Sequence, residues 1–372
     1  MKAEIAYIFV SFFFLPTILF AQPNSIFNTT LSDKRNKIID KELNKVEQKY
    51  KSQNTGSYDL QERGEAIEKT FRAISIELTM EYIFDAHGEQ NFEVIDSQGR
   101  RISRLHYPHS GPIIVYKGEI RFLPRVSIGG RYGSSLFKRT TATDTDWWPP
   151  IADVWWESNS RTKAEVETYD VNLYYRFLDL NKEQIKEKYL SSPGICEIFD
   201  FLRINNVESI ALDIFAGYQQ QKGRYGTTEL VDTVEWWTPV NIPYDGLDSF
   251  YKIIYQGPRL GLRGEGSFGK FNTRLSLAYA WLKTKAYGWW NKRNYSFEQN
   301  GRKGYGIDIG IETTYKLTPN FSTGVGFNYL LCKQERLTES GNLPGAVYQD
   351  LDIIRNANSR IYGLLVLLKY IW

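Results

Sequence analysis

The chain has 372 residues and a formal net charge of +3, which favours no particular partner and gives no sign of nucleic-acid binding. Aromatic residues make up 15% of the chain and charged residues 24%. This mixture is too polar for a bundle of membrane-spanning helices and too aromatic for an ordinary cytosolic domain.

Residues 1–21 are typical of a secretory signal peptide. Lys2 precedes an apolar run over 5–20, and the small residue Ala21 ends the segment. The alternative is a membrane-anchor helix, but Pro16 would interrupt it. We predict export and cleavage after Ala21.

Residues 22–72 predict a periplasmic extension that contains a short helix. Within 32–53 one helical face is apolar, formed by Ile39, Leu43, Val46 and Tyr50. That face would rest on the barrel or a neighbour, or would form a coiled-coil seam.

Residues 73–372 alternate between apolar and polar side chains with period 2, which predicts strands. The last strand carries aromatic residues at both ends of an apolar middle, and Trp372 closes it. This is the pattern of a lipid-facing strand whose two ends each contribute aromatic residues to a membrane interface. The sequence therefore predicts an all-β fold, a transmembrane antiparallel β-barrel in the cell outer membrane. Ten strands are expected, at 74–82, 111–122, 125–137, 169–177, 207–219, 252–268, 275–281, 307–313, 321–329 and 360–372.

Connection lengths predict the orientation of the barrel, because periplasmic turns are short and extracellular loops long. Tight turns are expected at 123–124, 269–270 and 318–320, and long outer loops near 138–165, 220–252, 285–303 and 334–357. The connection 179–206 breaks this rule, since it should be a short periplasmic turn. It contains a helical stretch near 181–190, which suggests a docking or plugging element.

The predicted outer loops hold the candidate functional residues. Four Trp-Trp pairs fall there, and we expect Trp147, Trp148, Trp289 and Trp290 to form an aromatic ligand-binding cleft. A girdle position is the alternative for such aromatics. Histidines 87, 106 and 109 are expected in exposed loops, and no metal site is indicated. The two cysteines, Cys196 and Cys332, are expected on opposite sides of the membrane and structurally incidental.

Asp144 and Asp146 lie two residues apart in an extended segment, so both carboxylates project to the same side. Two nearby carboxylates can hold or deprotonate a water molecule. The alternative is a solvated acidic loop.

Four segments resemble the omptin family of outer-membrane proteases: 99–108, 116–120, 124–130 and 144–147. Beyond position 166 the resemblance is topological, apart from 216–219. It implies a ten-stranded barrel that rises well above the membrane, with a hairpin that turns at 96–99 and with Asp144 and Asp146 as the acidic catalytic pair. In omptins an Asp-His dyad on the fourth outer loop activates the attacking water. Here the fourth loop, 285–300, contains neither Asp nor His. Glu298 is the carboxylate of that loop, and nothing in the sequence positions it as a base.

The first functional hypothesis is therefore an omptin-like surface barrel whose aromatic and acidic cleft binds a peptide, a glycan or lipopolysaccharide, with proteolysis altered or lost. The alternatives are a porin and an adhesin. A ten-stranded barrel is narrow, whereas general porins use about 16 to 18 strands. The sequence indicates no cofactor, although it leaves lipopolysaccharide open as a bound lipid, and it leaves the oligomeric state open.

Overall fold

The computed structural model describes residues 74–372, except for 97, 136–137, 149–152, 190–206, 236–237, 240–245, 292–293 and 344–345. The predicted signal peptide, the predicted N-terminal helix and Cys196 lie outside the described residues. None of the helical segments within these residues has the length and apolar character of a membrane span.

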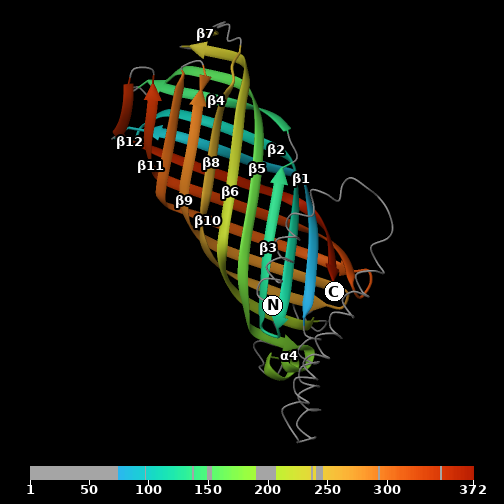
Figure 1. Ribbon diagram of the computed structural model, residues 1–372. Coiled ribbons are helices and arrows are strands. Elements are labelled where there is room, and N and C mark those ends of the chain that lie inside the picture. The colour runs from blue at the N-terminus through green and yellow to red at the C-terminus, as the bar shows by residue number, and fades with distance from the viewer. Residues whose placement is uncertain are drawn as a thin grey trace, which may run out of the picture. The chain divides into compact units, whose positions relative to one another are not determined.

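The described chain is almost entirely strand (Figure 1). The strands are β1 (Ser75–Ile95), β2 (Arg101–Leu123), β3 (Val126–Ser135), β4 (Lys138–Trp148), β5 (Asp153–Asn181), β6 (Val207–Glu235), β7 (Thr238–Pro239), β8 (Ser249–Phe268), β9 (Phe271–Trp290), β10 (Tyr295–Lys316), β11 (Phe321–Leu343) and β12 (Ala346–Ile371). Helix α4 (Lys182–Tyr189) follows β5.

The strands form one closed antiparallel ring with ten positions, as predicted. β3 and β4 share one position between β2 and β5, and β7 adds only two residues to the tip of β6. β1 pairs with β12, which closes the barrel. The backbone of Trp372 exchanges two hydrogen bonds with Ile76, at 2.8 and 3.0 Å. Closure leaves no bare strand edge within the membrane.

The lower half of the barrel, at the end with the tight turns, α4 and the C-terminus, has an apolar exterior. Exposed outward side chains include Leu173, Leu262, Leu275, Val325 and Leu364. Outward aromatic residues bracket this belt, with Tyr218, Tyr279, Trp281 and Tyr362 above and Phe268, Phe271, Tyr370 and Trp372 below. Because such a belt must face lipid, it identifies the membrane-spanning zone.

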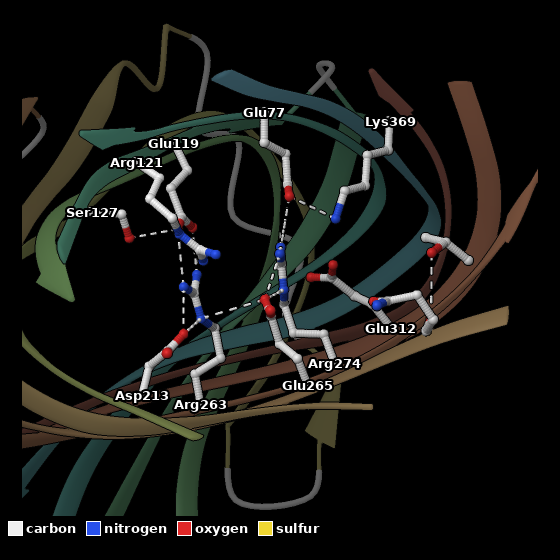
Figure 2. A network of polar contacts seen from close by, with 12 residues as sticks. Glu77, Glu119, Arg121, Ser127, Asp213, Arg263, Glu265, Arg274, Glu312 and Lys369 are labelled. Carbon is white, nitrogen blue, oxygen red and sulfur yellow. Dashed lines mark hydrogen bonds and ion pairs between the residues drawn. The ribbon is translucent and has the colours of Figure 1, made fainter. Parts of the chain in front are cut away.

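The interior of the membrane-spanning zone is an ion-pair layer. Arg263 of β8 binds Asp213 of β6 at 2.7 Å and also Glu119 on the far wall. Figure 2 shows Arg274 between Glu77 and Glu265, with an ion pair of 2.7 Å to each. Arg131 and Lys117 reach across to β10 in the same way. A cavity of about 80 Å³ remains among these side chains, enough for several water molecules.

The strands continue well above the membrane zone, which corrects the predicted outer loops. Residues 138–148, 153–165, 220–235, 285–290 and 295–303 are strand, and only short tips connect them. In this upper half the pattern inverts, because polar residues such as Lys283 and Lys285 face outward and apolar residues face inward. The upper half thus resembles a soluble barrel on top of a membrane barrel.

An aromatic layer fills the interior of the upper half. Its members come from β1, β2, β6, β8 and β10 and are all buried: Phe92, Tyr107, Tyr225, Tyr251, Tyr255, Tyr295 and Phe297. Tyr107 stacks on Tyr225 with ring centroids 4.8 Å apart, and it lies 6.0 Å from Tyr251. The lumen is therefore occupied by side chains at two levels, aromatic above and charged below.

Helix α4 confirms the predicted helical stretch after the fourth ring strand. Asn181 and Gln184 form a capping box, in which each side chain accepts a hydrogen bond from the other's backbone N–H, at 3.0 and 3.1 Å. Ile185 packs on Leu180 and Val207, which fixes the helix at the lower end of β5 and β6.

Candidate functional site

Asp144 and Asp146 lie on β4 and project to the same side, as their spacing predicts. Asp144 is paired with Leu105 of β2, and Asp146 with Ser103. Directly paired residues of an antiparallel ladder share a face, and Leu105 points into the aromatic core. Both carboxylates therefore face the upper interior of the barrel, and both have interaction partners in the structure.

The aromatic layer begins next to the acidic pair, on its membrane side. Tyr107 is 4% exposed and lies close enough to Asp144 for the two to interact electrostatically. Burial first, and then Asp144, raises the pKa of Tyr107, so its hydroxyl stays protonated. Tyr225 and Tyr251 are fully buried behind it. Tyr107 follows Leu105, the partner of Asp144, by two residues toward the membrane, so these rings form the layer directly below the acidic pair.

The far wall carries tyrosine, glutamine and glutamate. The Tyr251 hydroxyl donates to Gln299 at 3.1 Å, and the Gln299 amide donates to Glu339 at 2.6 Å. Glu339 also accepts from Tyr295 at 3.0 Å and pairs with Arg355 at 3.1 Å. Glu339 and Arg355 are both buried, so this carboxylate is held by Arg355, Tyr295 and Gln299 within the wall.

The predicted tryptophan cleft is not assembled as one surface, because adjacent residues of a strand point to opposite faces. Trp290 packs inward on Phe297 and Tyr295, at 5.4 and 5.5 Å. Trp289 is paired with Phe250 on the outer wall, with ring centroids 6.2 Å apart. Trp147 lies on β4 with Arg101 5.4 Å from its ring. Trp148 ends the same strand, and its side chain is outside the described residues.

The histidine prediction is wrong for His109, which points into the barrel and is 8% exposed. Gly88 leaves room for its ring, since a Cβ there would lie 2.1 Å from Nε2. Burial lowers the pKa of His109 to about 4, so the imidazole is neutral at physiological pH. His106 Nδ1–H donates to the amide oxygen of Asn91 at 2.7 Å, and His87 lies on the surface against Tyr362.

Cys332 is fully buried inside the barrel, and its pairing with Gly306 places it level with the upper girdle residues Tyr279 and Trp281, near the outer rim of the membrane as the topology predicts. It belongs to the same core as the aromatic layer. Burial in apolar surroundings makes the thiol unreactive.

The sequence missed the residues that fill the upper interior. The period-2 pattern continues through 283–290, where Lys283 and Lys285 alternate with Thr284 and Ala286. That alternation indicates a strand. Its outward residues are polar and its inward residues are small or aromatic, which is the reverse of the lipid-facing strands.

No protein-family model matches the chain, and no curated protein matches it in sequence. Among solved structures, the outer membrane protease OmpT from Escherichia coli matches with a TM-score of 0.66 and 16% identity. The match covers 80% of this chain and 97% of OmpT. At this identity the likeness shows the fold alone.

The chain has the fold of an outer-membrane β-barrel. A major outer membrane protein from Thermus thermophilus and Neisserial surface protein A also match, with TM-scores of 0.29 and 0.24, too low to carry an argument. Their identities are 9% and 10%, and the matches cover 78% and 80% of this chain and 99% and 96% of theirs. The lipid-facing belt agrees with the predicted location in the cell outer membrane.

Proposed function

We propose that this chain is an omptin-like outer-membrane barrel that acts as a surface binding protein and has lost proteolysis. The observation that carries the proposal is the aromatic layer next to Asp144. An attacking water needs an acidic pair and a base across an open cleft. Here Tyr107, below Asp144, stacks toward Tyr251, and the wall behind Tyr251 carries Gln299.

The fourth outer connection supports the same proposal. Omptins place their Asp-His dyad there, whereas 285–300 in this chain supplies Tyr295, Phe297 and Gln299 to the interior. Glu298 is exposed and alternates with these inward residues, so it faces away from Asp144. Of the residues described in that segment, none is placed to act as general base.

A porin function is disfavoured by the same interior. Ion pairs from Arg263 and Arg274 span the lower lumen, and the aromatic layer closes the upper lumen. Side chains can fill a barrel of this strand number, because the lumen is narrow. A binding role, which includes adhesion, needs neither a cleft nor a channel.

A cleavage assay tests this proposal. Protein folded in neutral detergent, with and without added lipopolysaccharide, is incubated with a mixture of peptides rich in Arg and Lys. Mass spectrometry should find no cleavage above that of an Asp144→Asn, Asp146→Asn double variant. Cleavage by the unaltered chain that the double variant lacks would overturn the proposal.

A further inference from the structure

One sector of the outer wall above the membrane zone carries cations without carboxylate partners. Among the described residues, none of these side chains forms an ion pair, and all point outward from β6, β8, β9 and β10: Arg224, Lys252, Lys283, Lys285, Arg302 and Lys303. We call this set the cationic sector. All but Lys252 are exposed.

Five other outward cations of the upper half do have carboxylate partners. Arg161 pairs with Glu229 at 3.1 Å, Lys222 with Glu167 at 2.7 Å, and Lys333 with Glu335 at 2.9 Å. Arg360 and Arg101 also pair with glutamates, Glu89 and Glu93. Within the part of the chain that the structure describes, Arg104 and Arg336 of the upper half form no ion pair either, so cations without carboxylate partners are concentrated in the cationic sector but are not confined to it.

Within the cationic sector two positive charges lie directly opposite each other. Arg224 of β6 is the cross-strand partner of Lys252 of β8. Like charges in directly opposed positions destabilise a sheet. A bound anion would remove this repulsion. Two carboxylates border the sector. Glu165 of β5 is the cross-strand partner of Arg224 on its other side, and Glu298 lies outward on β10 opposite Tyr287, but neither forms an ion pair with a member of the sector among the described residues.

Three aromatic side chains lie beside these cations on the same outer face. Phe250 is 5.5 Å from Tyr287 and 6.2 Å from Trp289 between ring centroids. The Arg224 guanidinium lies 5.9 Å from the Phe250 ring. Lys252 is paired with Tyr287, so charge and ring alternate across the strands. We call Phe250, Tyr287 and Trp289 the outer aromatic cluster.

The cluster lies far above the lipid headgroups. Trp281 belongs to the upper girdle, and Trp289 follows eight residues later on the same outward face of β9. Eight residues span about 26 Å of strand, or about 20 Å in height at a typical tilt. A ligand that contacts both the cluster and the cations must therefore extend into the extracellular space.

We propose that the cationic sector and the outer aromatic cluster bind an acidic polysaccharide from outside the cell. The lysines and arginines would hold its carboxylates, and the exposed ring of Tyr287 with the half-buried rings of Phe250 and Trp289 would contact the apolar faces of its sugars. This inference rests on the proposed binding function and names its ligand class and its surface, which is the outer wall and not the interior.

The test is a titration of the detergent-folded full chain with polygalacturonate, followed by tryptophan fluorescence. Binding should occur, and added salt should weaken it. The double variant Lys252→Gln, Lys285→Gln should lose at least tenfold in affinity. The matched double variant Arg161→Gln, Lys163→Gln on β5 should stay within twofold. Trp289→Ala should also bind more weakly, whereas Trp281→Ala should not. Heat-dependent gel mobility shows that each variant is folded.

Neutral dextran, poly-glutamate and purified lipopolysaccharide are parallel probes. No binding of polygalacturonate, equal losses in both double variants, or tight binding of poly-glutamate that is insensitive to Trp289→Ala would overturn the inference. Binding of lipopolysaccharide but not of polygalacturonate would overturn it as well. If polygalacturonate does not bind and no peptide is cleaved, the polysaccharide inference fails while the proposed loss of proteolysis stands. The two failures are therefore distinguishable.

Discussion

Tyr107 of β2 stacks on Tyr225 of β6 with ring centroids 4.8 Å apart, directly in front of the wall that carries Asp144. This contact joins two sides of the ring through the interior. It lies on the membrane side of the acidic pair, next to Asp144. The stacking of these two tyrosines is the contact on which the proposed loss of proteolysis and the proposed closed lumen both rest.

Loss of the Tyr225 ring should destabilise the barrel strongly. Tyr225 is fully buried, and Tyr225→Ala leaves a cavity in the aromatic layer. Truncation of a large aromatic core residue costs about 3–5 kcal/mol. Urea unfolding of vesicle-inserted protein measures this, with Val231→Ala, 53% exposed on the same strand, as the control. A loss no larger than that of the control would show that the layer is loosely packed.

Acid should weaken the fold through His109. Burial lowers its pKa from 6.5 to about 4, so the folded state binds fewer protons than the unfolded state between these values. The resulting stability is fully present above pH 6.5 and is lost as pH falls through 4, by up to about 3 kcal/mol. The nearby Glu89 opposes the shift only in part.

The measurement for His109 is the pH dependence of urea unfolding, compared with that of His109→Gln. Carboxylates titrate in both proteins, so the difference between the two curves reports on the histidine. The unaltered protein should lose more stability between pH 6.5 and 4. Parallel curves would mean that the imidazole is hydrated or already charged.

Ion pairs inside the barrel should matter far more than those on its surface. Arg263→Met leaves Glu119 and Asp213 without their shared cation, and removal of one partner of a buried pair costs about 3–5 kcal/mol. Arg161→Met breaks the exposed pair with Glu229 and should cost about 0–1 kcal/mol. Equal unfolding midpoints of the two variants would argue that water fills the lower lumen.

The membrane half of the fold was predictable because lipid imposes one rule on every strand. Leu364 and Val366 alternate with inward neighbours in the same way as Leu275 and Leu277, so the ring of ten strands followed from the pattern. The hairpin at Asp96 was also predictable, and its side chain accepts from the backbone N–H groups of Gln98 and Arg100 at 2.9 Å. A local turn depends only on local residues.

The upper half was not predictable in the same way. Polar outward residues and mixed inward residues are typical of loops, so the pattern predicts loops at 220–235 and 285–303, although these segments are largely strand. The stacking of Tyr107 on Tyr225 joins residues 118 positions apart on nonadjacent strands, and no spacing rule encodes it. Trp289 and Trp290 point to opposite faces because both lie on β9, and the sequence pattern placed them in a loop.

Planar-bilayer recording tests the closed lumen most directly. Protein inserted from detergent, with its folding checked by gel mobility, should give no steady conductance at moderate voltages, because the aromatic layer and the ion-pair layer close the interior in series. Steady conductance steps from the folded, unaltered chain would contradict a lumen closed by the aromatic layer and the ion-pair layer, and would favour a porin function.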